Sequence, residues 1–362
     1  MWRFLTAVRV STVFCCIAVV AALIAPQTVS VAAAQVQTTA GAESRDMGTQ
    51  ALAFLPSELW VHVNDSLTWT FPTAEIHTVT FLRQNTTPQQ SRPPRPGMPG
   101  GGCPGTTPDG SSVNGSHCVS SGELVSGQTY TVNFPTPGNF KLVCLVHVDM
   151  TGVVHVLNLA ETLPHDQAFY DRQAQTNRAT LLSDGVRLER RGLDAAERSF
   201  RGREGREGDD ERHDERASGN AVTAGIAEIV STTGGGVDTS AVMRFLRDNT
   251  VVRVGETVEW TNLGPIVPHT VTFGVEPANP MPPTPVLVTT DSDGARHATI
   301  GSPTDSVNSG FLVAAPQERV GLPQSPQAVT RFRVTFTAPG TFNYICALHD
   351  DLGMKGTVVV VP

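Results

Sequence analysis

The chain has 362 residues, of which 40% are hydrophobic and only 17% are charged. This length allows two domains of ordinary size, and the 33 glycines, 26 prolines and short alternating Val and Thr runs predict β structure and exclude a helical bundle. A formal net charge of −8 disfavours binding to nucleic acid, which requires a basic surface. Six cysteines are too few for a disulfide-built scaffold, so each is interpreted individually.

Residues 1–34 are predicted to be an export signal. Basic residues precede an apolar run from Val10 to Ala25, and three alanines then fit a cleavage site before Gln35. A retained membrane anchor is the alternative, but an apolar run of about 16 residues is shorter than the ~20 needed to span a bilayer. We therefore expect no membrane span after cleavage, and a periplasmic or extracellular location where disulfides persist.

Two copies of one unit follow the signal. Within each copy the apolar residues alternate with period two, which indicates half-buried antiparallel strands and hence a β-sandwich. The matching segments, first copy and then second, are 61–69 with 252–260, 77–81 with 269–273, and 130–140 with 332–342. These matches predict an all-β fold class with two sandwich domains, at 50–160 and 240–362.

A Pro- and Gly-rich insertion, Gln84 to Gly122, holds Cys103 and Cys118 in the first copy only. In an oxidising compartment a disulfide between them is the preferred interpretation. A further metal site that uses His117 is the alternative, but the insertion lacks enough other ligands.

A charged linker is predicted over residues 161–220. A helix is expected around Asp166 to Leu182, and disorder after it. The stretch from Glu197 to Arg216 contains eight acidic residues, six arginines and one large apolar residue, so it cannot bury a core. A docking tail for a charged partner is disfavoured because the two signs nearly cancel.

The candidate metal ligands occur as the same set in both copies. Each set has a histidine in a His-Thr-Val-Thr-Phe pentad and a later loop with a cysteine, a histidine and a methionine. The two sets are His77, Cys144, His147 and Met150, and His269, Cys346, His349 and Met354. A thiolate and two imidazoles with a weak thioether are the donors of a type 1 (blue) copper site. We therefore predict one copper in each domain.

The two copies resemble the cupredoxin family, over roughly 50–160 and 240–362. The loop of the second copy, Cys346 to Met354, is similar to that of plastocyanin and pseudoazurin, whereas Cys144 to Met150 has the shorter spacing of amicyanin. The resemblance implies Greek-key sandwiches with a copper at the loop end. Val146 and Leu348 replace the proline that usually precedes the loop histidine.

Transport of single electrons is the predicted function. A four-ligand site without an open position favours electron transfer over catalysis, so we expect no enzyme activity. Two-domain copper oxidases and nitrite reductases carry a histidine beside the ligand cysteine and H-x-H pairs, but here Leu145 and Ala347 follow the cysteines and no H-x-H occurs. Copper handling without a redox circuit remains the alternative, because it would use the same ligands.

The expected partners are redox proteins, such as a cytochrome or a copper-containing donor or acceptor. In the family the loop histidine lies at the surface, within an apolar patch where electrons pass. His147 has apolar neighbours, whereas Asp350 and Asp351 follow His349. We therefore expect the second domain to react faster with basic partners, at a rate that falls with ionic strength.

Overall fold

The computed structural model describes residues 33–85, 103, 106–147, 149–204, 220–231, 236–262, 264, 267–313 and 329–362. Residues Ala33–Pro362 form one compact unit. Nearly all of the predicted export signal, and residues 205–219 of the predicted linker, lie outside the described residues. No helix in the described ranges is both long enough and apolar enough to span a membrane.

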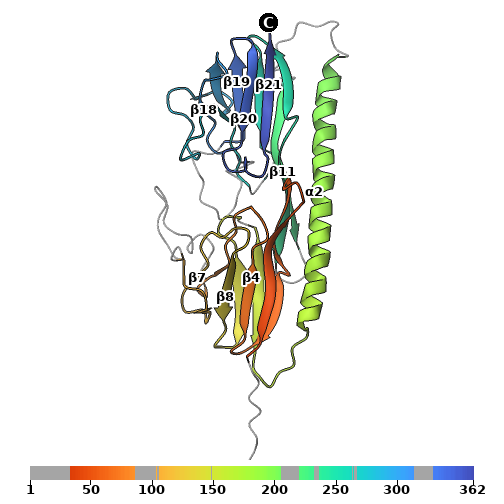
Figure 1. Ribbon diagram of the computed structural model, residues 1–362, viewed down its shortest axis with the longest axis vertical. Coiled ribbons are helices and arrows are strands. Elements are labelled where there is room, and N and C mark those ends of the chain that lie inside the picture. The colour runs from red at the N-terminus through yellow and green to blue at the C-terminus, as the bar shows by residue number, and fades with distance from the viewer. Residues whose placement is uncertain are drawn as a thin grey trace, which may run out of the picture. The chain divides into compact units, whose positions relative to one another are not determined.

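The first copy folds as two facing sheets (Figure 1). One sheet contains β2 (Thr49–Leu55), β1 (Gln35–Glu43), β4 (Ser66–Thr70), β8 (Thr129–Asn133) and β6 (Ser111–Ser112), in that order. The other contains β3 (Glu58–His62), β10 (Thr151–Leu157), β9 (Gly138–Val143), β5 (Thr80–Phe81) and β7 (Val119–Ser120). Strands distant in sequence are neighbours in both sheets, since β1 pairs with β4 and β3 with β10, each in parallel.

The second copy repeats this arrangement. One sheet contains β12 (Val237–Leu246), β11 (Ala221–Ser231), β14 (Thr257–Thr261), β19 (Arg331–Phe336), β17 (Arg296–Ile300) and β16 (Thr289–Thr290). The other contains β13 (Asn249–Arg253), β21 (Lys355–Val361), β20 (Gly340–Ile345), β15 (Thr272–Phe273) and β18 (Val307–Asn308). The predicted all-β fold class is therefore confirmed. The strands β1 and β11 lie before residues 50 and 240, where the domains were predicted to begin.

Equivalent aromatic side chains form the centre of each sandwich. Trp69 and Trp260 are both fully buried, and each packs edge-on against a phenylalanine of its own copy, Phe81 or Phe273, with ring centroids 5.7 Å apart. Both phenylalanines end the repeated pentad that begins with a candidate ligand histidine. The core packing therefore fixes the short strand that follows this histidine.

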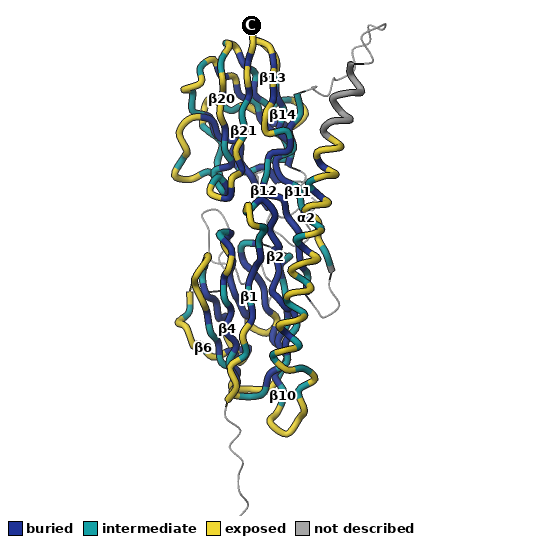
Figure 2. Tube along the Cα trace, turned by 45° about the vertical axis from the view of Figure 1, so that its right-hand side comes forward, coloured by how far each residue is buried: buried dark blue, intermediate teal, exposed yellow. Residues whose placement is uncertain are grey.

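In the described part of the chain, one continuous 16-stranded sheet joins the two copies, because β12 pairs with β2 and also with β10. Strand β12 pairs antiparallel with β2, from Thr239 opposite Leu52 to Val242 opposite Thr49. All seven residues of β2 are buried, as the dark blue trace in Figure 2 shows. This pairing leaves neither strand as an open edge.

The helix α2 (Gln167–Glu204) is much longer than the helix predicted around Asp166 to Leu182. It packs against β1 and β2 of the first copy and against β11 and β12 of the second (Figure 2). Its side chains Tyr170, Leu181 and Leu188 are buried. The expectation of disorder from Glu197 is wrong for residues 197–204, because the helix continues through them.

Candidate metal centres

Two chain segments bring the first set of candidate ligands together, the segment with His77 and the loop from Cys144 to Met150. His77 precedes β5, and its backbone N–H donates a hydrogen bond to the carbonyl of Leu124 at 3.0 Å. Cys144 directly follows β9, and Met150 directly precedes β10. The N–H of Cys144 donates to the carbonyl of Met150 at 2.9 Å, which closes the loop that carries His147.

The first centre is compact and buried. The candidate donor atoms of His77, Cys144 and His147 all lie within 4.8 Å of one another, and Sγ of Cys144 is 3.8 Å from Nδ1 of His147. None of these three residues is more than 2% exposed. Met150 is fully buried in the same apolar cluster as Cys144.

The second centre has the same construction. The N–H of His269 donates to the carbonyl of Leu312, and the N–H of Cys346 donates to the carbonyl of Met354, both at 3.0 Å. Sγ of Cys346 lies 3.4 Å from Nδ1 of His349 and 3.8 Å from Nδ1 of His269. The two Nδ1 atoms are 3.1 Å apart. The donor atoms of this second group also fall within 4.8 Å of one another.

The threonine after each pentad histidine forms hydrogen bonds that hold the cysteine in place. The N–H of Thr78 donates to Sγ of Cys144 at 3.4 Å, and the N–H of Thr270 donates to Sγ of Cys346 at 3.3 Å. Each threonine hydroxyl also accepts the N–H of the residue after the cysteine, at 2.8 Å in both centres. The repeated His-Thr pair thus supplies one candidate ligand and holds another.

Both thiols are prepared to ionise. Burial raises the pKa of Cys144, but a hydrogen bond with His147 and the charges of His147 and His77 outweigh it and hold that pKa well below its ordinary value. At Cys346 burial is likewise outweighed, by the charge of His349 and a hydrogen bond with His269, and the pKa is again well below normal. Thiolate is the form of cysteine that binds a metal.

The donor set fits a copper ion. Nδ1 of His77 is buried and has no hydrogen-bond partner among the described residues, so it is free to bind a metal. The remaining Nδ1 atoms face a cysteine sulfur in their own centre. A soft thiolate combined with imidazoles suits copper in both of its common oxidation states.

The loop histidines are not at the surface. His147 is 2% exposed and His349 is 4% exposed, so the expectation that their edges form surface patches for partner proteins is wrong. Their Nε2 atoms face one buried carboxylate: Oε1 of Glu75 is 3.1 Å from His147, and Oε2 is 3.6 Å from His349. Burial raises the pKa of Glu75, but the charge of His349 and the hydrogen bond with His147 lower it to about 2.

A glycine lies against each pentad histidine, and neither glycine was predicted. Gly41 and Gly225 occupy irregularities in β1 and β11, with φ of +80° and +75°. A Cβ atom at Gly41 would lie 2.3 Å from Nε2 of His77, and one at Gly225 would lie 2.0 Å from Nε2 of His269. Each glycine follows a Thr-Ala pair. Extending the repeat comparison to the N-terminal side would have found them.

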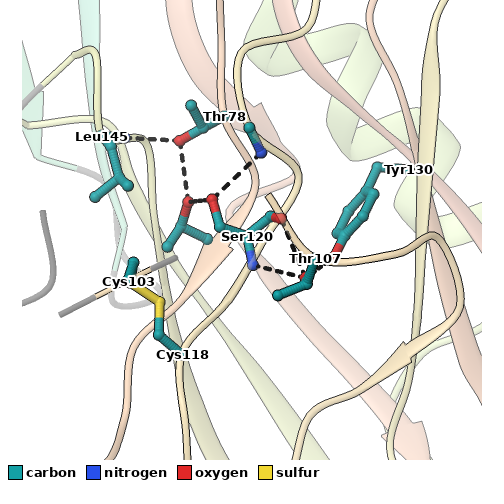
Figure 3. Close-up of a disulfide and its surroundings, with 9 residues drawn as sticks. Thr78, Cys103, Thr107, Cys118, Ser120, Tyr130 and Leu145 are labelled. Atoms are coloured by element: carbon teal, nitrogen blue, oxygen red, sulfur yellow. Dashed lines mark hydrogen bonds between the residues drawn. A yellow bond between two sulfur atoms is a disulfide. The ribbon is translucent and has the colours of Figure 1, made fainter. Parts of the chain in front are cut away.

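The predicted disulfide between Cys103 and Cys118 is present (Figure 3). Its two cysteines pack in one buried cluster with Leu82, Val143 and Leu145. Leu145 follows the candidate ligand Cys144, and its N–H bonds to the hydroxyl of Thr78. The disulfide therefore packs against the start of the first ligand loop.

Residues 232–361 match the model of a family described as copper binding proteins, plastocyanin/azurin family. A search of the curated proteins found no match.

Several solved structures resemble parts of the chain. A mutant plastocyanin of fern is 23% identical over 39% of this chain and 99% of its own, with a TM-score of 0.21. A mutant amicyanin in its reduced Cu(I) form is 20% identical over 36% of this chain and 87% of its own, with a TM-score of 0.22. A copper-containing nitrite reductase from Thermus scotoductus is 12% identical over 91% of this chain and 68% of its own, with a TM-score of 0.24.

Proposed function

We propose that this chain, whose residues 232–361 belong to the plastocyanin/azurin family of copper-binding proteins, carries single electrons between redox proteins. The observation that carries the proposal is the repeated group of one cysteine and two histidines, buried in each copy with a methionine from the same loop. Bound copper would supply a one-electron couple at each group.

The copper ligands would be the predicted residues. They are His77, Cys144, His147 and Met150 in the first centre, and His269, Cys346, His349 and Met354 in the second. Both centres would be of the blue, type 1 class. The loop ends are tied by backbone hydrogen bonds from cysteine to methionine, and the backbone N–H of each pentad histidine donates to the carbonyl of a leucine. Side chains held in this way need little rearrangement when the charge of a bound ion changes.

We further propose that the chain is not an enzyme and that it works outside the cytoplasm. Leu145 and Ala347 follow the two cysteines, where copper oxidases and nitrite reductases would carry a histidine. The disulfide between Cys103 and Cys118 suits an oxidising compartment. The partners would be a cytochrome or another copper-containing protein.

Rapid mixing with a reduced c-type cytochrome tests this function. The copper-loaded protein should oxidise the cytochrome once per oxidised centre, and a variant with both Cys144→Ser and Cys346→Ser, treated identically, should not. Copper-loaded protein that leaves the cytochrome reduced, yet passes its copper to a metal-free acceptor protein, would support copper handling instead. Continued oxygen or nitrite consumption with excess cytochrome would support an enzyme.

A further inference from the structure

Glu75 is present in only one copy of the repeat. It lies two residues before the pentad histidine His77, and the matching residue before His269 is Val267. Val267 is 1% exposed and packs in the apolar cluster of the first copy. The carboxylate of Glu75 therefore contacts both centres and has no counterpart in the second copy, although the ligand sets of the centres are duplicated.

Both loop histidines have their rings in the same orientation toward this carboxylate. In each ring Nδ1 faces the cysteine sulfur, at 3.8 Å in His147 and 3.4 Å in His349. In each ring Nε2 faces Glu75, at 3.1 Å and 3.6 Å. A neutral imidazole that gives Nδ1 to a metal keeps its proton on Nε2. His147 can then donate that proton to Oε1 of Glu75 in a hydrogen bond, and His349 faces Oε2 at an ion-pair distance.

Glu75 is suited to hold both histidines, His147 through a hydrogen bond and His349 through an ion-pair contact. Its side chain is 8% exposed, so water competes little for the carboxylate oxygens. Thr73 donates its hydroxyl to the backbone carbonyl of Glu75 at 3.0 Å, which holds the segment that carries the carboxylate. If the two histidines moved away, the charge of the buried Glu75 carboxylate would have no partner, and this would cost free energy.

We propose that Glu75 is a positioning residue shared by the two metal centres, with one carboxylate oxygen orienting the loop histidine of each. The inference rests on the proposed copper function and adds that the two centres are not independent. Carboxylates that orient ligand histidines contribute about 10- to 100-fold to metal affinity. A change at Glu75, in the first copy, should therefore weaken copper binding by the second copy.

The test isolates the second centre. The variant Cys144→Ser has lost the thiolate of the first centre, so it reports on the second centre. Copper(I) affinity is measured by competition with a coloured chelator in this single variant and in the double variant that also carries Glu75→Gln. Glutamine keeps the size of the side chain but loses the charge and one acceptor. We expect the second centre to lose about 10-fold or more in copper affinity. The reverse experiment in Cys346→Ser should give a similar loss at the first centre.

Glu58→Gln is the matched control. Glu58 also contacts a histidine through Nε2, at 2.9 Å, but that histidine is His155, which belongs to neither centre. This variant should leave both affinities unchanged. The proposal that Glu75 is shared would be overturned if Glu75→Gln lowered the copper affinity of the first centre alone. It would also be overturned if Glu75→Gln and Glu58→Gln changed the copper affinities equally. Failure of the parent chain to bind copper would overturn the proposed function instead.

Nuclear magnetic resonance gives a second readout, independent of affinity. In the full chain loaded with copper(I), which is diamagnetic, the Nε2 proton of His349 should exchange slowly with solvent because it faces the buried carboxylate of Glu75. In Glu75→Ala, checked by far-ultraviolet circular dichroism for an intact fold, that proton should exchange much faster. Unchanged protection of the His349 proton would contradict the proposal.

Discussion

The backbone of Gly41 lies directly against the ring of His77, so that a Cβ atom there would be 2.3 Å from Nε2. The same relationship recurs between Gly225 and His269 at 2.0 Å. Each glycine also has a positive φ, which other residues adopt with difficulty. These glycines set how far each pentad histidine can move away from its cysteine.

Gly41→Ala should therefore damage the first centre as well as the fold. The left-handed backbone alone should cost about 1–2 kcal/mol in unfolding free energy. The added methyl group must also displace the His77 ring, and we expect copper affinity to fall on the order of 10-fold. Chemical denaturation and copper titration measure the two effects.

Gly127→Ala is the matched control for this prediction. Gly127 has φ of +84°, but a Cβ atom there would meet nothing within 4 Å. It should show the loss of stability without the loss of copper affinity. Equal copper affinity in the two variants would refute the role assigned to Gly41.

Asp238 should make stability depend on pH. It is fully buried in β12, and its carboxyl oxygens have no hydrogen-bond partner among the described residues. Burial raises its pKa from 3.8 to about 7. The native state thus holds the proton more tightly than the unfolded state does, and stability falls as pH rises from about 4 to about 7.

The unfolding free energy of the parent is compared with that of Asp238→Asn, whose side chain stays neutral at every pH tested. Near pH 4 the two copper-free proteins should have similar unfolding free energies. Above pH 7 the Asn variant should be more stable by up to about 4 kcal/mol. Denaturation curves whose difference does not change with pH would show that Asp238 does not titrate in this way.

Removal of the Cys103–Cys118 disulfide should destabilise the first copy. The two cysteines are 15 residues apart, and closing a loop of that size restricts the unfolded chain by about 3 kcal/mol. Replacing both cysteines by alanine should lower the unfolding free energy by roughly that amount. The visible thiolate-to-copper absorption of the second centre should stay unchanged. A variant as stable as the parent would show that the crosslink is not structural.

Each cysteine of the two centres should account for about half of the visible absorption. Cys144→Ser should remove the thiolate-to-copper band of the first centre, and Cys346→Ser that of the second. Metal analysis shows whether an ion is retained without the sulfur. A variant that kept the full band would contradict the assignment of that cysteine.

The repeat made the fold class and both clusters predictable. His77 and His269 share a pentad, and the loops after Cys144 and Cys346 share their residue types, so one copy supports the interpretation of the other. The structure brings three of the four predicted residues of each set within 4.8 Å. Spacing was sufficient because a tight loop between strands leaves few places for these side chains.

Features that depend on contact between the copies were not predictable. Glu75 is a single acidic residue without a partner in the repeat, and its two histidine contacts arise only when both loops pack against it. The same packing buries His147 and His349, which reverses their expected exposure. The length of α2 was missed because its buried leucines, Leu181 and Leu188, are widely spaced within a polar sequence.

The most direct test of the central claim is the visible absorption spectrum of the copper-loaded protein, with copper measured per chain. Our account predicts two coppers per chain and a strong thiolate-to-copper band that disappears on reduction and returns on oxidation. Copper-loaded protein without such a band, or with a band that neither Cys144→Ser nor Cys346→Ser diminishes, would contradict it.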